Sequence, residues 1–91
     1  MKKSKSIDSI SWCNEYISLF GNSTDPAIKE KVAEVLLMKG IRLSELRNSE
    51  EAIASYDEVL KRFGDSTDFE LKYRVSQALY NKGAEFWLLR K

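Results

Sequence analysis

The sequence has 91 residues, of which 15 are basic and 14 are acidic, so that the formal net charge is +1. This even balance argues against nucleic acid or anionic lipid as the main partner. Hydrophobic and charged fractions of 43% and 32% argue against a disordered chain. Histidine is absent and cysteine occurs once, which excludes an intrachain disulfide and a thiolate metal cluster.

The N-terminal region lacks the unbroken apolar stretch of a secretory signal. Lys2, Lys3 and Lys5 are expected to form a solvated tail, and Asp8 and Glu15 interrupt the residues that follow. No window of the sequence approaches the roughly 20 apolar residues of a membrane span. We therefore expect a cytoplasmic protein.

Apolar periodicity and capping signals predict an all-α chain without strands, organised as one domain over residues 1–91. The predicted helices cover residues of about 7–20, 26–46, 50–63 and 69–90. Asp25 and Asp68 are suited to N-cap positions, and Pro26 suits the first position of a helix. Asn48–Ser49 precedes the third helix, and Gly64 ends it.

The predicted buried faces follow the helical period of 3.6 residues. The second helix and the third helix would bury Ile28, Val32, Leu36, Leu43, Leu46, Ala52, Ile53, Tyr56, Leu60 and Phe63. Glycine inside a helix costs about 1 kcal/mol relative to alanine. Gly40 and Gly83 therefore indicate places where a neighbouring helix comes close.

The chain resembles itself when it is shifted by 43 positions. "FGNSTDP", which begins at Phe20, becomes "FGDSTDF", which begins at Phe63. Identical residues continue beyond this segment, as in the pairs Val32/Val75, Leu36/Leu79, Lys39/Lys82, Gly40/Gly83 and Arg47/Arg90. A period of this size is typical of stacked helical repeats. The repeated phrase would be a helix end, a turn and the next N-cap.

The repeat resembles the tetratricopeptide repeat (TPR) family over roughly residues 7–91. Its pattern of large, small and apolar residues, followed by alanine and an aromatic residue, matches Leu36, Gly40, Leu43, Ala52 and Tyr56. The second copy supplies Leu79, Gly83 and Phe86. Two features depart from the family: the period exceeds the usual length of about 34 residues, and Lys39 and Gly64 replace its common leucine and proline.

The resemblance implies a short right-handed solenoid of antiparallel helix-turn-helix repeats, with about four helices, that binds a protein or peptide and is not an enzyme. The groove would be lined by the first helices of successive units. By position it would contain Glu34, Leu37, Met38, Ile41, Glu45, Gln77, Tyr80, Asn81, Ala84 and Trp87. The alternative is that Leu37, Met38 and Ile41 are core residues. Since Leu37 and Ile41 are apolar, the clamp for acidic tails known in part of the family is not expected.

The repeat frame leaves both terminal helices without their usual partners. The final segment, "AEFWLLRK", is rich in apolar residues, which is typical of an interaction surface. We expect self-association, with a two-fold dimer favoured over head-to-tail growth, through Ile10, Trp12, Phe86, Trp87 and Leu89. The alternatives are that this cluster folds back within one chain, that the protein is a self-assembling structural piece without a separate ligand, or that the sequence is a fragment of a longer array.

The sequence contains no recognisable catalytic, cofactor-binding or metal-binding motif. Cys13 aligns with Tyr56 on a buried face and has no histidine to activate it, so we expect a core thiol. Asp25, Asp65 and Asp68 are explained by their places at helix starts. No catalytic residue, cofactor or metal is therefore predicted.

Overall fold

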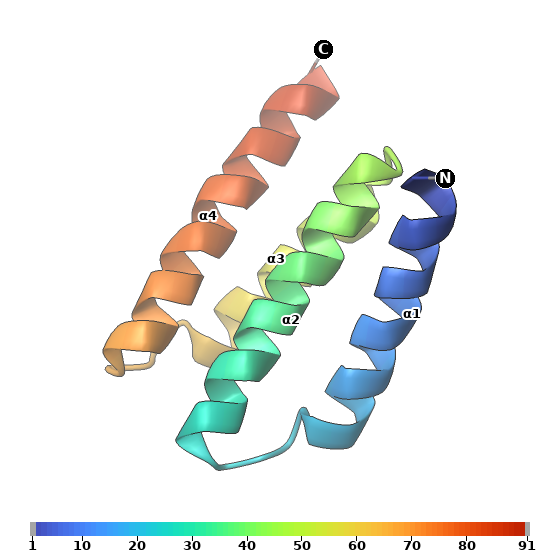
Figure 1. Ribbon diagram of the computed structural model, residues 1–91. Helices are drawn as coiled ribbons and strands as arrows, with labels where there is room; N and C mark the ends of the chain where they lie inside the picture. The colour runs from blue at the N-terminus through green and yellow to red at the C-terminus, as the bar shows by residue number, and fades with distance from the viewer. Residues whose placement is uncertain (1, 91) are drawn as a thin grey trace.

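The computed structural model describes the backbone of residues 2–90 and the side chains of residues 7–90, and within this part it contains four helices and no strand (Figure 1). The helices are α1 (Lys2–Phe20), α2 (Pro26–Glu45), α3 (Ser49–Phe63) and α4 (Phe69–Arg90). The predicted all-α class is confirmed. The predicted helix ends agree within one residue except at the N-terminus.

The first helix begins at Lys2, whereas the sequence predicted a start at about residue 7 with a tail before it. That prediction was wrong for the backbone. The segment "KKSKS" contains neither glycine nor proline, and lysine is a good helix former, so that nothing in it stops the helix from extending. The lysine side chains of this segment lie outside the described residues.

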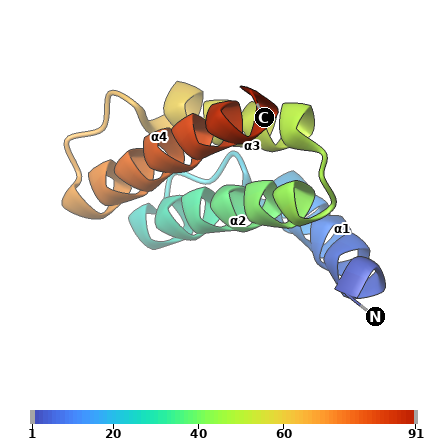
Figure 2. The ribbon, with the colours of Figure 1, turned by 90° about the horizontal axis from the view of Figure 1, so that it is seen from above.

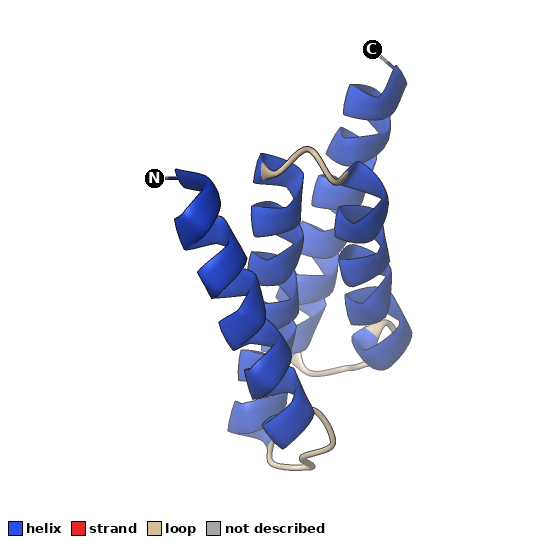
Figure 3. Cartoon of the chain, turned by 90° about the vertical axis from the view of Figure 1, so that its right-hand side faces the viewer, coloured by secondary structure: helices blue, strands red, loops and turns tan. Residues whose placement is uncertain are grey.

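Successive helices run in opposite directions, and α2 is the central element (Figure 1). Helix α1 packs on α2, while α3 packs on both α2 and α4, and α2 and α4 also meet. Seen from above, α1 lies along one flank of α2, with α3 and α4 beyond the other flank (Figure 2). A view from the side shows α1 standing apart from α3 (Figure 3), and within the described residues these two helices do not pack together. Helices α1 and α4 therefore lie at opposite edges.

The predicted caps are present at three helix starts. The Asp25 carboxylate accepts hydrogen bonds from the backbone N–H groups of Ala27 (2.9 Å) and Ile28 (3.2 Å). Asp68 accepts one from Leu71 N–H at 3.1 Å. Asn48 likewise caps α3 through the N–H of Glu51. Each cap satisfies backbone donors that the first turn leaves unpaired and is worth about 1 kcal/mol.

The core is formed where α2, α3 and α4 meet, with part of α1 packed against it. Its buried residues are Val32, Ala33, Leu36, Leu37, Leu43, Ala52, Tyr56, Val59, Phe63, Leu71 and Ala78. Cys13 is completely buried, in agreement with its predicted core position. Ile28, Ile53, Leu46 and Leu60, which the periodicity placed in the core, are only partly buried.

The two repeated glycines have different surroundings. A β-carbon at Gly40 would lie 2.7 Å from Cζ of Tyr56, so the close helix approach predicted there is confirmed. At Gly83 no described helix of the chain comes close, since a β-carbon there would meet no atom within 4 Å. Tyr56 comes from α3, which packs beside Gly40. The described chain contains no further helix that could pack beside Gly83.

Candidate protein-binding groove

A groove of about 270 Å³ lies between α2 and α4, which run in the same direction (Figure 1). It is lined by Glu34, Leu37, Met38, Ile41, Arg42, Arg74, Gln77 and Asn81. The α2 residues recur at intervals of three and four positions, which brings them to one face of the helix. Gln77 and Asn81 do the same on α4. The groove therefore has one wall from each helix.

The floor of the groove is apolar and belongs to α2. Leu37 is buried, Met38 is partly buried and Ile41 is 40% exposed. Methionine is flexible and polarizable, so its side chain can adapt to different apolar ligands. The predicted alternative, that these residues are core, fits Leu37 alone. Met38 and Ile41 present apolar surface to the groove.

Arg74 fixes the wall on α4. Its Nε donates to Glu30 Oε2 at 2.7 Å, and Nη2 lies 3.8 Å from Glu34 Oε2. A third donor, Nη1, reaches Gln77 Oε1 at 3.0 Å. The side chains of Arg74 and Glu30 are each only 22% exposed, so this pair is screened less than an ordinary surface ion pair. The network ties α4 to α2 and orients the Gln77 amide at the groove.

A buried carboxylate lies one helical turn beyond the groove. Glu85 is 3% exposed, and its Oε2 accepts a hydrogen bond from Ser44 Oγ at 2.6 Å. Its other oxygen, Oε1, is the only buried side-chain nitrogen or oxygen of the described residues without a hydrogen-bond partner. Burial, together with the nearby charge of Glu85, raises the pKa of Tyr56 to about 12. The two helices are thus linked by polar contacts on both sides of the groove.

The structure brings together part of the groove that the sequence predicted. Glu34, Leu37, Met38, Ile41, Gln77 and Asn81 line it, whereas Glu45, Tyr80, Ala84 and Trp87 do not. Tyr80 and Trp87 are 79% and 57% exposed on the outer side of α4. Sequence reasoning missed Arg42 and Arg74. The available signal for Arg74 was a pair of acids, Glu30 and Glu34, spaced by one turn on the facing helix.

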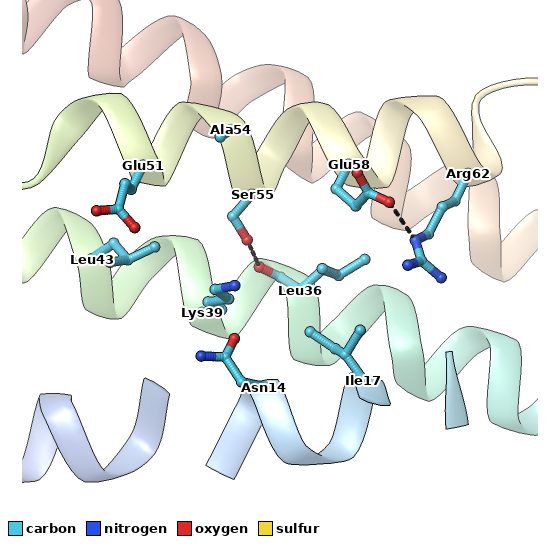
Figure 4. Close-up of a pocket in the computed structure, with 10 residues that line it drawn as sticks. All are labelled: Asn14, Ile17, Leu36, Lys39, Leu43, Glu51, Ala54, Ser55, Glu58 and Arg62. Carbon is cyan, nitrogen blue, oxygen red and sulfur yellow. Dashed lines mark hydrogen bonds and ion pairs between the residues drawn. The ribbon is translucent and has the colours of Figure 1, made fainter. Parts of the chain in front are cut away.

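A second pocket, of about 300 Å³, lies between α1 and α3 over α2 (Figure 4). Lys39 rises from its floor, with Asn14 on the α1 wall and Ser55 on the α3 wall. The Ser55 hydroxyl donates to the Leu36 carbonyl at 2.7 Å, and Arg62 pairs with Glu58 at 2.7 Å. The polar groups on the α3 wall therefore already have partners within the protein.

Neither pocket contains an evident catalytic centre. Burial raises the pKa of Cys13, although Lys39 lowers it in part, and a buried protonated thiol is a poor nucleophile. Among the described residues, no group of three or more acidic, cysteine or histidine side chains could hold a metal ion. What the α2–α4 groove offers is an apolar floor flanked by amide and charged groups. This arrangement suits binding.

The residues predicted for self-association fall into two groups. Ile10 packs against the core, and does not belong to the exposed set. Trp12, Phe86, Trp87 and Leu89 are each about half exposed, at 51%, 49%, 57% and 52%. Further exposed apolar side chains on α4 are Phe69, Tyr73, Leu79, Tyr80 and Leu88. By helical spacing, Phe69, Tyr73, Leu79, Tyr80, Phe86 and Trp87 share the side of α4 that faces away from the core, which we call its outer face, whereas Leu89 follows the buried Glu85 by one turn. The outer face is therefore a large apolar surface, of the kind that marks interaction sites.

The sequence matches no protein-family model, and comparison with curated proteins and with solved structures gives no significant similarity. In the described part of the chain, no helix combines the length and the apolar character needed to cross a membrane.

Proposed function

We propose that this chain is a non-enzymatic protein-interaction module of the TPR type, whose α2–α4 groove binds a segment of another protein. In this proposal α2–α3 is one complete helix-turn-helix unit, and α1 and α4 belong to incomplete neighbouring units of a short right-handed solenoid. The support comes from the 43-residue repeat, the antiparallel succession of helices and the contact between the parallel helices α2 and α4.

The observation that carries the proposal is that the groove combines an apolar floor on α2 with a polar wall on α4. Met38 and Ile41 offer apolar surface for one or two anchoring side chains. On the wall, the Asn81 amide makes no hydrogen bond to another described residue and can pair with both the N–H and the C=O of a ligand backbone. Such a groove suits a short peptide segment with apolar anchors.

Selection from a random peptide library displayed on phage tests this proposal. We expect enriched peptides with one or two large apolar residues, whose binding weakens at least about tenfold in Ile41→Glu because a carboxylate would enter the apolar floor. Ser18→Glu is the matched control, since it adds the same charge at an exposed position of α1 that does not line the groove. Failure to enrich any peptide, or equal binding to both variants, would contradict the proposal.

A second candidate function is self-association through the outer faces of α1 and α4. It is favoured by the many exposed apolar residues of α4 and by Trp12 on α1, which are costly to leave in water. Self-association could bring several grooves into one assembly, and this would raise the avidity for a partner that carries repeated segments. The two functions are compatible because the groove and the outer face use different sides of α4.

A further inference from the structure

The two halves of the repeat differ in which apolar residues are covered. Leu36 and Leu43 of α2 are 3% and 5% exposed, because α3 packs over them. Their counterparts on α4, Leu79 and Phe86, are 56% and 49% exposed. The surface that holds α3 on α2 is thus repeated on α4, where the described chain supplies no helix to cover it.

A second flank of α4 shows the same contrast. Leu37, on the flank of α2 that α4 covers, is 5% exposed, while its counterpart Tyr80 is 79% exposed. Gly83 likewise has open space where Gly40 has the ring of Tyr56. Helix α2 packs against both α3 and α4. Helix α4 is the counterpart of α2 in the repeat, and the described chain supplies no helix at either of the two equivalent positions beside it. A pair of helices is needed to fill both places.

Helix α1 carries the complementary surface. On α3, Ser55, Val59 and Phe63 lie at successive turns and are all buried, at 5%, 0% and 6% exposed. The equivalent row on α1 is Trp12, Tyr16 and Phe20, whose rings lie 5.6 and 4.8 Å apart between successive centroids. Trp12 and Phe20 are 51% and 40% exposed, since α1 has α2 on one side and, within the described residues, no helix on the other.

We infer that the outer face of α4 receives the α1–α2 pair of a second copy of this chain, stacked in the same direction. This inference rests on the self-association proposed above and specifies its partner and register. In the stack, α1 of the second copy packs on α4 of the first copy, in the same way as α3 packs on α2 within one chain. Helix α2 of the second copy then lies beside α4 of the first copy, in the same way as α4 lies beside α2 within one chain. Trp12 of the second copy meets Leu79, because Ser55 meets Leu36 within one chain.

The polar contacts of the first unit have compatible replacements at this junction. Within one chain, Glu30 of α2 pairs with Arg74 of α4. At the equivalent positions of the junction, Tyr73 of the first copy would face Lys31 of the second copy. Likewise, Ser44 of α2 donates a hydrogen bond to Glu85 of α4 within one chain. At the equivalent positions of the junction, Trp87 of the first copy would face Arg42 of the second copy. Each replacement brings a cation to an aromatic ring, which is a favourable contact. No carboxylate is left opposite a carboxylate in either replacement.

The stack grows head-to-tail. Helices α1 and α4 lie at opposite edges of the molecule (Figure 1), so one junction uses α4 of one copy and α1 of the next. The remaining α1 and α4 faces stay open for further copies. An interface between two different surfaces extends in this way unless its rotation closes a ring.

Variants that block one face each provide the test. Leu79→Glu blocks the α4 face and Trp12→Glu blocks the α1 face, while Ser18→Glu adds the same charge at an exposed position of α1 outside the aromatic row. Helical circular dichroism and urea unfolding establish that each variant is folded. Masses are measured by light scattering or sedimentation over a range of concentrations.

We expect the wild type and Ser18→Glu to grow beyond a dimer as the concentration rises. Each blocked variant should remain at 10.5 kDa. An equal mixture of the two should form a pair of twice that mass and nothing larger, because Trp12→Glu keeps an intact α4 face and Leu79→Glu keeps an intact α1 face. A wild type that stays monomeric would refute self-association itself. A wild type that stops at the dimer, or a mixture that does not pair, would overturn the head-to-tail stack and leave self-association standing.

The register is tested by exchanging one predicted contact. Tyr73→Arg places a second cation opposite Lys31 and should weaken assembly about tenfold, whereas Tyr73→Arg combined with Lys31→Glu should restore it. The restored pair would copy the Arg74–Glu30 contact of the first unit. If the double variant assembles no better than Tyr73→Arg, these residues do not meet and the register is wrong.

Discussion

The ring of Tyr56 lies directly against the backbone of Gly40, so that a β-carbon at Gly40 would be 2.7 Å from Cζ and 2.9 Å from Cδ1. Tyr56 is 2% exposed, so its ring is enclosed by the core. This contact explains why α2 contains a glycine in its interior in spite of the helix propensity that it costs. It also distinguishes Gly40 from its counterpart Gly83.

Gly40→Ala and Gly83→Ala should therefore have opposite effects on the free energy of unfolding. At Gly40 the added methyl group overlaps a buried ring, and overpacking of this kind costs about 1–3 kcal/mol. At Gly83 the methyl group meets nothing within 4 Å, so the better helix propensity of alanine should stabilise the chain by about 0.5–1 kcal/mol. Urea unfolding at low protein concentration measures both. Equal effects at the two glycines would show that Tyr56 does not pack as described.

Tyr56 should make stability depend on pH in the alkaline range. Its pKa in the folded state is about 12, against 10.0 for a free tyrosine side chain. The unfolded chain therefore loses this proton first as the pH rises, and folding stability falls between pH 10 and pH 12. A shift of this size corresponds to about 2–3 kcal/mol. Below pH 10 the contribution is fully present.

Comparison with Tyr56→Phe isolates this effect, because the two proteins differ only in the hydroxyl group of this side chain. As the pH rises from 9 to 11, we expect the unfolding free energy of the wild type to fall relative to that of Tyr56→Phe. The reason is that phenylalanine has no proton to lose in the unfolded state. Absorbance of tyrosinate during the titration identifies the late-ionising residue. A difference that does not change with pH would contradict the assigned environment of Tyr56.

The Ser44–Glu85 hydrogen bond should be important for stability because the carboxylate is buried. Ser44→Ala removes the one hydrogen bond that Glu85 makes to the described residues, and a buried polar group without a partner costs about 1–3 kcal/mol. Replacing both partners, as in Ser44→Ala with Glu85→Leu, should recover most of this loss because no polar group is then left buried there. A double-mutant cycle in urea measures the coupling. Additive losses from the two changes would rule out a direct interaction.

Arg47→Gly should stabilise the chain at the end of α2. Arg47 has a φ angle of 62°, in the left-handed region, and its N–H donates to the Ser44 carbonyl at 2.9 Å while that of Asn48 reaches the Leu43 carbonyl at 2.9 Å. This is the Schellman arrangement, which favours glycine at the left-handed position. A left-handed residue with a side chain costs about 1–2 kcal/mol, so we expect a gain of about 1 kcal/mol in the unfolding free energy.

Arg47→Ala is the matched control for this substitution, because alanine also removes the charged side chain but keeps the steric cost of a β-carbon. Thermal and urea unfolding of the three proteins should rank glycine above arginine and place alanine close to arginine. If alanine stabilises as much as glycine, the effect comes from the charge and not from the backbone.

The sequence contained enough local information for the helices, their caps and most of the core. Asp25, Asn48 and Asp68 act on backbone groups within three residues of themselves, so their roles can be read from neighbouring positions. The start of α1 was the exception. Lysine favours a helix, but the segment before residue 7 carries neither an apolar period nor a capping residue that would indicate where the helix begins.

The candidate groove could be predicted only in part, because its walls depend on how distant residues meet. The family resemblance implied a groove that contains Met38 and Ile41, and both line the groove between α2 and α4. The contact of Arg74 with Glu30 joins residues 44 positions apart, and its geometry depends on the packing of two helices. Glu85 was likewise unpredictable, since its repeat counterpart Arg42 is partly exposed and a glutamate is rarely buried.

The central claim, that the α2–α4 groove binds a polypeptide segment, is tested most directly by methyl NMR of the protein with a peptide enriched by selection. Ile41, Met38 and Leu37 each carry methyl groups at the floor of the groove. The account predicts saturable shift changes centred on these methyl groups, while Leu79 on the outer side of α4 and Ile17 in the second pocket stay unchanged. Changes centred on Leu79 or Ile17, with Met38 and Ile41 unaffected, would contradict it.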